Sequence, residues 1–270
     1  MSFWGKVAAT LEFDFRRSLT VGRLSAFAAL SLFPPALAIV ISLFGPGLEA
    51  APVIIGVTVM AAGILAELLW ATPIVYGELE GKTWLYLATR PRGVLAVLLG
   101  KYLVAVLWTV AVCGIALTLS VLVVAADEVP NASANLGPRA WDMWRVFAIL
   151  IVMAAFSYAA IFAWIGVVFH RRAMVFAMAY VIALEVIIAQ VPAVINQISV
   201  RHHLTALAVK WLDFRALGDE ELDDFILQQM LGSLEPDWRN IGMVLATAVV
   251  ALSASAWIIT SREYLTAEEV

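Results

Sequence analysis

Residues 102–126 read YLVAVLWTVAVCGIALTLSVLVVAA and contain no charged side chain. Lys101 precedes this stretch and Asp127 follows it. A helix needs about 20 apolar residues to cross a hydrocarbon core that is about 30 Å thick. At 25 residues the stretch is long enough, and it therefore predicts a transmembrane helix.

The remainder of the chain has the same apolar character. Of its 270 residues, 63% are hydrophobic and 14% are charged, whereas soluble domains are about 45–50% apolar and about 25% charged. With 17 Lys and Arg against 21 Asp and Glu, the net charge is −4, which provides no basic field for a nucleic acid. The composition excludes a soluble globular protein, a disordered chain and a nucleic-acid binder, and it makes the lipid bilayer the main solvent.

Five further stretches have the length and hydropathy of a membrane span. One of them, between Arg23 and Glu49, is also free of charge, and two others are each interrupted by one glutamate. We therefore expect an all-α, polytopic membrane protein whose single domain, residues 1–270, has six transmembrane helices. The expected spans are residues 24–48, 52–76, 102–126, 146–169, 173–195 and 241–261.

Lys and Arg residues predict the orientation, because they are in excess on the cytoplasmic side of membrane proteins. With the N-terminus inside, the inner segments carry 11 of them and the outer segments carry 6. We expect a multi-pass protein of the cytoplasmic membrane with both termini in the cytoplasm. Several tryptophans lie towards span ends, where interfacial anchors are found, although a core position explains some of them as well. They are Trp70, Trp108, Trp141, Trp144, Trp238 and Trp257.

Residues 1–23 form an amphipathic pattern before the first span. Phe3, Val7 and Leu11 recur at helical spacing, and charged side chains occupy much of the remaining surface. A helix with such a mixed face lies in the membrane interface rather than across the membrane. The alternative is a positively charged tail that only sets the topology.

The segment 196–240, between the fifth and sixth spans, holds two further helical patterns. Leu204, Leu207 and Trp211 repeat at helical spacing. Asp219 begins an acidic run, and negative charge is favourable at a helix N-terminus. We therefore expect an extracytoplasmic helical segment at this place.

The segment 77–93, GELEGKTWLYLATRPRG, joins the second and third spans. It is longer than a cytoplasmic turn requires, and Pro73 is expected to bend the helix just before it. The charged residues of the segment suit the steering of a partner protein, and Trp84 and Leu85 suit anchoring in a pocket. The alternative is an interfacial helix whose Lys and Arg side chains contact lipid phosphates.

A motif of acidic, glycine, leucine and proline positions runs through this segment into the third span. It consists of Glu78, Glu80, Gly81, Lys82, Thr83, Leu85, Leu87, Arg90, Pro91, Gly100 and Lys101. The motif resembles the first cytoplasmic loop of ABC-2-type permeases, the membrane subunits of ATP-binding-cassette (ABC) exporters with the ABCG-like, type V fold. Lys82 between Gly81 and Thr83 departs from the family pattern, as does Arg90-Pro91-Arg92 in place of an apolar-Pro-x-Arg run. The amphipathic start, the six spans and the outer helices extend the resemblance over nearly the whole chain.

The resemblance implies that segment 77–93 is a coupling loop, which docks on a cytoplasmic ABC ATPase and transmits its closure. That partner would bind ATP and Mg, and a second permease copy or a paralogue would complete the dimer around an export pathway. The helices of 196–240 would close the exit of the pathway, unless they form a lid without a role in transport. The implied coupling-loop residues are Glu78, Glu80, Gly81, Lys82, Thr83, Trp84, Leu85, Arg90, Pro91 and Arg92.

The sequence contains neither a nucleotide-binding loop nor a hydrolase motif. His202 and His203 are adjacent, so on a helix they point in different directions and complete no metal-ligand set. We therefore expect a transport subunit rather than an enzyme, without a catalytic residue, a metal ion or a cofactor of its own.

Two glutamates lie deep within predicted spans. Glu67 precedes Gly77 by ten residues and Glu185 follows Ala173 by twelve, which places both roughly 15–18 Å from the inner surface. A charge at that depth costs about 2.5–3.5 kcal/mol on insertion, so a functional role is the first expectation. Each of them either lines the pathway or binds a cation, or it is a protonated carboxyl that hydrogen-bonds to a neighbouring helix. Their matched depth is compatible with mutual contact.

Two other functions stay open at this point. In an ion-coupled secondary transporter, Glu67 and Glu185 would titrate during transport. In a non-transporting membrane assembly factor, the outer helices would be essential and the two glutamates would not.

Overall fold

The computed structural model describes residues 2–44, 51–75, 77–78, 93–128, 140–169, 171–187, 197, 199–212 and 236–261. Within these ranges the regular structure is helical throughout, and they contain no strand. The all-α prediction is thereby confirmed for the described residues.

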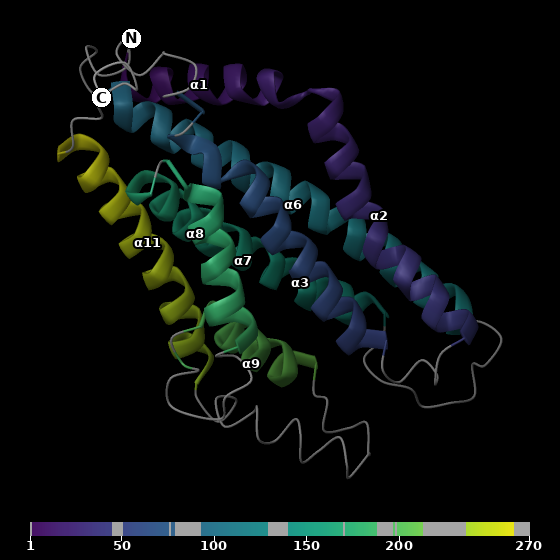
Figure 1. The fold of residues 1–270 in the computed structure, drawn as a ribbon. Helices are drawn as coiled ribbons and strands as arrows, with labels where there is room; N and C mark the ends of the chain where they lie inside the picture. Colours follow the sequence, from purple (N-terminus) through teal and green to yellow (C-terminus); the bar gives the residue numbers. More distant parts are fainter. Residues whose placement is uncertain are drawn as a thin grey trace.

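Figure 1 shows the order of the helices along the chain. The described α-helices are α1 (Phe3–Ser18), α2 (Val21–Phe44), α3 (Ala51–Trp70), α6 (Gly93–Glu128), α7 (Ala140–Val168), α8 (Ala173–Tyr180), α9 (Val200–Leu212) and α11 (Asp237–Ser261). A 3-10 turn, η2 (Thr72–Ile74), follows α3, and a π-helix, η4 (Val181–Ile187), continues α8.

Five described helices are long and apolar enough to cross a membrane, so the chain is a multi-pass membrane protein. The sixth predicted crossing, residues 173–195, is described only over Ala173–Ile187, which is apolar but shorter than a full span. Residues 188–195 lie outside the described part, so this crossing stays a prediction. The five helices are Val21–Leu43, Val53–Ile74, Gly93–Ala125, Ala140–Val168 and Asp237–Ser261.

Three of these helices begin before the predicted spans. Helix α6 begins at Gly93 rather than at residue 102, α7 at Ala140 rather than at residue 146, and α11 at Asp237 rather than at residue 241. The predicted limits were set by charged residues, and a helix can continue past the apolar core into the interface.

The long helices run side by side as a bundle, and α1 lies across one end of it (Figure 1). The first turns of α6 and the last turns of α3, α7 and α11 gather at this end, which we call the α1 end. Helix α9 lies at the opposite end, beside the first turns of α11, and we call this the α9 end. The described chain therefore begins and finishes at the same end of the bundle.

Local hydrogen bonds set the limits of α1. Ser2 is the N-cap, and its hydroxyl accepts from the backbone N–H of Gly5 at 3.2 Å. At the other end the Ser18 hydroxyl donates to the carbonyl oxygen of Phe15 at 2.6 Å. Thr20 Oγ1 then accepts from the backbone N–H of Arg23 at 3.4 Å, so a new helix starts in a new direction. A helix is thus present within the predicted range 1–23, while its place in the membrane interface stays a prediction.

Trp108 of α6 joins three other helices at the α1 end. Its Nε1–H donates to Ser18 Oγ of α1 at 2.7 Å. Its ring stacks on Phe15 of α1 and on Trp70 of α3, with centroids 5.4 and 5.7 Å away, and meets the edge of Phe27 of α2. Such aromatic pairs contribute about 0.5–1.5 kcal/mol each beyond the area they bury. This cluster packs α1 on the bundle.

The tryptophans predicted near span ends differ in burial, and their place relative to the membrane stays a prediction. Trp141, Trp238 and Trp257 are exposed, as interfacial anchors are. Trp70 and Trp108 are buried, because each lies on the face of its helix that packs against another helix.

Glycines allow two close approaches between elements. A Cβ on Gly166 of α7 would lie 2.4 Å from the carbonyl oxygen of Thr72 in η2. A Cβ on Gly100 of α6 would lie 2.8 Å from the Cβ of Thr10 in α1. Small residues at helix contacts are typical of membrane proteins, where packing rather than water exclusion drives association.

Candidate functional site

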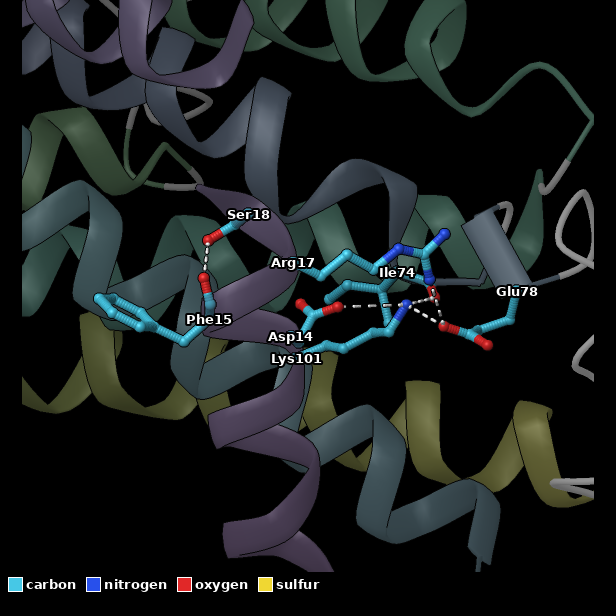
Figure 2. A network of polar contacts seen from close by, with 7 residues as sticks. All are labelled: Asp14, Phe15, Arg17, Ser18, Ile74, Glu78 and Lys101. Atoms are coloured by element: carbon cyan, nitrogen blue, oxygen red, sulfur yellow. Dashed lines mark hydrogen bonds and ion pairs between the residues drawn. The ribbon is translucent and has the colours of Figure 1, made fainter. Parts of the chain in front are cut away.

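A cluster of charged side chains joins α1 to α6 at the α1 end (Figure 2). Lys101 of α6 lies at its centre. Its Nζ atom is 2.5 Å from Glu78 Oε1 and 3.9 Å from Asp14 Oδ1 of α1, and it donates to the carbonyl oxygen of Ile74 at 3.3 Å. Arg17 of α1 approaches Glu78 Oε1 to 4.0 Å. We call Asp14, Arg17, Glu78 and Lys101 the α1 charge cluster.

The α1 charge cluster is largely shielded from solvent. The side chains of Lys101 and Glu78 are each 10% exposed, and that of Asp14 is 17% exposed. Arg17 is about half exposed, so its ion pair contributes less. Removing one partner of a buried ion pair costs about 3–5 kcal/mol, because the remaining charge is left without compensation. We therefore expect Lys101, Glu78 and Asp14 to hold their three segments together.

The cluster lies at the base of the predicted coupling loop, segment 77–93. Glu78 is the second residue of that segment, and Lys101 follows its last residue by eight positions. The ion pair between them joins the two spans that the segment connects, and Asp14 adds the N-terminal helix to the same contact. Helix α3 ends at Trp70. Pro73 lies just beyond it, within the 3-10 turn η2, at the place where the sequence predicts a bend.

Of the predicted coupling-loop residues, Glu78 is described and buried. Sequence reasoning missed Asp14 and Arg17 as its neighbours, since these charges were assigned to the polar face of an interfacial helix. They are too far from Glu78 in the sequence for any spacing rule to connect them. The other predicted residues lie outside the described part: Glu80, Gly81, Lys82, Thr83, Trp84, Leu85, Arg90, Pro91 and Arg92.

Glu67 lies on α3 and is wholly buried. A cavity of about 10 Å³ borders it, with Thr109 of α6 and Tyr158 of α7 in its lining. Among the described residues, neither carboxyl oxygen of Glu67 has a hydrogen-bond partner, and neither has Thr109 Oγ1. A cavity of this volume holds about one water molecule, and a buried carboxyl without a partner is costly. The site suits a water molecule or a proton rather than a large substrate.

Glu185 lies within η4, is 1% exposed, and accepts hydrogen bonds at both carboxyl oxygens. Its Oε2 accepts from Tyr158 Oη of α7 at 2.9 Å and from Ser199 Oγ at 3.1 Å. Its Oε1 accepts from Tyr180 Oη of α8 at 3.1 Å. Hydrogen bonds of this kind compensate a buried carboxyl for its lost water.

The π-helix η4 brings the backbone of Glu185 into the same network. Wide turns of this kind occur frequently at functional sites. The carbonyl oxygen of Glu185 accepts a hydrogen bond at 2.9 Å from Nη1 of Arg201, which lies on α9. A positive charge from the α9 end thus approaches a carboxyl that lies inside the bundle.

Tyr158 lies between the two glutamates. It lines the cavity beside Glu67 and donates its hydroxyl to Glu185. Within the described part of the chain no hydrogen bond joins Glu67 to Glu185 directly, and Tyr158 is bonded to Glu185 alone of the two. Sequence reasoning missed Tyr158, because a tyrosine in an apolar span is equally compatible with simple packing.

His203 connects α9 to α11 at the α9 end. Its Nδ1 lies 2.8 Å from Asn240 Oδ1, and its Nε2 lies 2.8 Å from the carbonyl oxygen of Gln197. Both ring nitrogens are thus engaged by protein groups. Over the described ranges, no three His, Cys, Asp or Glu side chains are grouped so that they could hold a metal ion.

Helix α9 coincides with the first helical pattern predicted in segment 196–240. Leu204 and Leu207 are buried as that pattern expects, and Lys210 Nζ lies 2.5 Å from Asp237 Oδ1 at the start of α11. The second pattern, which begins at Asp219, lies outside the described residues.

No protein-family model and no curated protein matches this sequence.

Proposed function

We propose that this chain is the membrane-spanning permease subunit of an ATP-driven exporter of the ABC-2 type. A separate cytoplasmic ABC ATPase would bind ATP and Mg and hydrolyse the nucleotide. A second permease copy or a paralogue would complete the pathway. The chain itself would then contribute the membrane helices and the surface on which the ATPase acts.

The observation that carries the proposal is the α1 charge cluster. Glu78 lies at the start of segment 77–93, Lys101 lies on α6, which follows that segment, and Asp14 lies on α1. A force on that segment would therefore reach α1 and α6 through buried ion pairs. It would reach η2 as well, because Lys101 also binds the carbonyl oxygen of Ile74. A permease driven from outside its own chain needs such a connection.

The elements around the cluster suggest how the motion would spread. Regular α-helix ends at Trp70, so the segment through Ile74 offers a place where α3 can change direction. Hinges of this kind are a few residues at the ends of elements. Closure of the ATPase would displace segment 77–93, tilt α3 and α6 at their α1 ends, and carry α1 along.

Capture of an ATPase subunit tests the docking. The tagged chain is co-expressed with a candidate ABC ATPase from the same genome and purified from membranes. Glu80→Arg with Arg92→Glu reverses two charges of the coupling loop and is expected to lower capture at least tenfold, since rim charges steer and register a partner. The control is Asp142→Arg with Arg145→Glu, which reverses two exposed charges in the first turns of α7 and should leave capture unchanged. Equal capture by both variants would count against the proposal.

The second candidate is an ion-coupled secondary transporter, and the setting of Glu67 favours it. This carboxyl is buried without a partner among the described residues, and Tyr158 connects its cavity to Glu185. Chains of ionisable groups inside a membrane are typical of proton relays.

Proton flux into vesicles that contain the chain alone separates the two functions. The vesicles enclose a pH-sensitive dye, and a potassium gradient with valinomycin sets the membrane potential. A flux that needs no ATPase and that Glu67→Gln abolishes would support the secondary transporter. A flux no greater than that of protein-free vesicles leaves the exporter as the better proposal.

A further inference from the structure

A cavity of about 250 Å³ opens beside the α1 charge cluster. It lies between α1, the start of α2, η2 and α6. Arg17, Thr20 and Arg23 line it from the N-terminal side, and Lys101 lines it from α6. The remaining wall is mainly apolar and includes Trp70 and Val104.

The cavity has an excess of positive charge. Three cationic side chains line it, those of Arg17, Arg23 and Lys101, against the single carboxylate of Asp14. Lys101 is neutralised by Glu78 and Asp14, but Arg17 reaches a carboxylate only at 4.0 Å. Arg23 is half buried and forms no ion pair with any described residue. A partly desolvated guanidinium without a counter-charge favours the binding of an anion.

The position and the apolar wall indicate what kind of anion fits. The cavity lies at the α1 end, where the membrane-spanning helices finish, and the Lys and Arg count predicts that this end faces the cytoplasm. Basic pockets between helices on that side bind anionic lipid headgroups. Small-molecule pockets usually have volumes of about 300–1,000 Å³, so this one suits a headgroup rather than a whole lipid.

We propose that this cavity binds the phosphate of an anionic phospholipid from the adjoining leaflet. Arg23 and Arg17 bind the phosphate oxygens with their planar guanidinium groups. Thr20 offers a hydroxyl to the same group, while Trp70 and Val104 contact the apolar part of the lipid. The bound lipid fills the angle between α1 and α2 and so stabilises α1 across the end of the bundle. The proposal requires a membrane protein but not an exporter.

Lipid titration of the purified full-length chain tests this site. The chain is held in a zwitterionic detergent, and binding of short-chain phosphatidylglycerol, short-chain phosphatidylcholine or inorganic phosphate is followed by native mass spectrometry and by the unfolding temperature. Arg23→Gln is compared with Arg16→Gln, which removes the same charge from an exposed position of α1 whose ion pair is with Glu12. Arg17→Gln serves as a second cavity variant.

Phosphatidylglycerol is expected to bind the wild type and Arg16→Gln equally, and at least tenfold more weakly to Arg23→Gln and Arg17→Gln. Phosphatidylcholine should bind all four proteins weakly, and inorganic phosphate should not raise the unfolding temperature. Equal binding of phosphatidylglycerol by Arg23→Gln and Arg16→Gln would overturn the proposal. Inorganic phosphate that binds as tightly as phosphatidylglycerol would assign the site to a free anion and overturn the lipid as its occupant. The unfolding temperature without lipid shows whether each variant is folded.

Discussion

Tyr158 lies near two buried carboxyls that have different surroundings. Glu185 has three hydrogen-bond donors, one of them Tyr158, and its backbone carbonyl is held by Arg201. Glu67 has no donor in good hydrogen-bond geometry among the described residues, although Thr109 lies close to it and Tyr158 lines its cavity. Proteins retain such a costly group where its proton or its charge is used. At the residue scale, Glu67 is therefore the better candidate for a titrating group and Glu185 for a structural one.

Tyr158→Phe is expected to lower the free energy of unfolding by about 1–3 kcal/mol, because it leaves a buried carboxyl oxygen with one donor fewer. Tyr102→Phe is the matched control. Its hydroxyl donates to the carbonyl oxygen of Phe156, which already serves the backbone of α7, so the expected loss is about 1 kcal/mol or less. Denaturant unfolding in detergent measures both. A Tyr158 variant as stable as the control variant would show that the bond to Glu185 contributes little.

Gly166→Ala is expected to destabilise the protein by about 1–3 kcal/mol through overpacking. The new Cβ would lie 2.4 Å from a backbone oxygen of Thr72, which cannot rotate away as a side chain does. Gly114→Ala is the control, because a Cβ there meets nothing within 4 Å, and alanine favours a helix by up to about 1 kcal/mol. The unfolding temperature should fall for the first variant and stay or rise for the second. A fall of the same size in both would refute the close approach of α7 to η2.

The residues that sequence reasoning identified were those that carry a charge where none is expected. Glu67 and Glu185 stand out because the surrounding residues are apolar. Tyr158 and Trp108 do not stand out, since their roles depend on which helix faces them. The partners of Lys101 were missed for the same reason: a contact between Asp14 and Lys101 exists only once α1 lies across α6.

At the scale of elements, α1 is packed against the bundle and is not a separate tail. Ser18 has a central place, since its hydroxyl donates to Phe15 and accepts from Trp108. The α1 charge cluster makes a second attachment on the same helix. A helix in the interface that only set the topology would need neither contact.

Trp108→Phe is expected to loosen α1 while leaving the bundle folded. Phenylalanine keeps most of the ring contacts but loses the hydrogen bond to Ser18, which contributes about 0.5–1.5 kcal/mol. Amide hydrogen exchange over residues 3–18 should become roughly 2- to 10-fold faster. Trp164→Phe, at an exposed position of α7, should leave that exchange unchanged. Unaltered exchange in Trp108→Phe would mean that α1 is held by other contacts.

Element positions were predictable to the extent that apolar length determines them. The spans now seen as α2, α3, α6, α7 and α11 were all expected, because uncharged runs of this length have few other solutions. The π-helix η4 was not expected. One of its backbone carbonyls, that of Glu185, accepts a hydrogen bond from Arg201 of another helix. A contact between distant residues of this kind cannot be recognised from the spacing of apolar residues along the chain.

At the scale of the whole molecule, the start of α1 and the finish of α11 lie at one end of the bundle, and the start of α11 lies at the other (Figure 1). An even number of crossings produces this arrangement. The five described spans would reach such a number with one more crossing, and the chain that begins at Ala173 is the segment that the sequence predicts for it.

Cysteine labelling tests this topology. Cys113 is buried and is the one cysteine in the sequence, so Cys113→Ala gives a background without thiols. Single substitutions Ser2→Cys, Ser261→Cys and Pro236→Cys then place thiols at exposed positions. In intact cells, an impermeant maleimide is expected to label Pro236→Cys, and to label the other two only after permeabilisation. Labelling of Ser2→Cys and Ser261→Cys from opposite sides would mean an odd number of crossings, and labelling of both from outside would mean an inverted chain.

The wide turn at η4 also restricts how this region can change in length. A regular helix advances about 100° per residue, so deleting one of residues 181–184 would turn Glu185 by roughly that angle relative to α8, which precedes it. The carboxyl could no longer face Tyr158 and Ser199 together, even though every chemical group would still be present. The number of residues in this turn therefore sets the direction in which Glu185 points. Insertions or deletions should be tolerated here far less readily than exchanges of one apolar side chain for another.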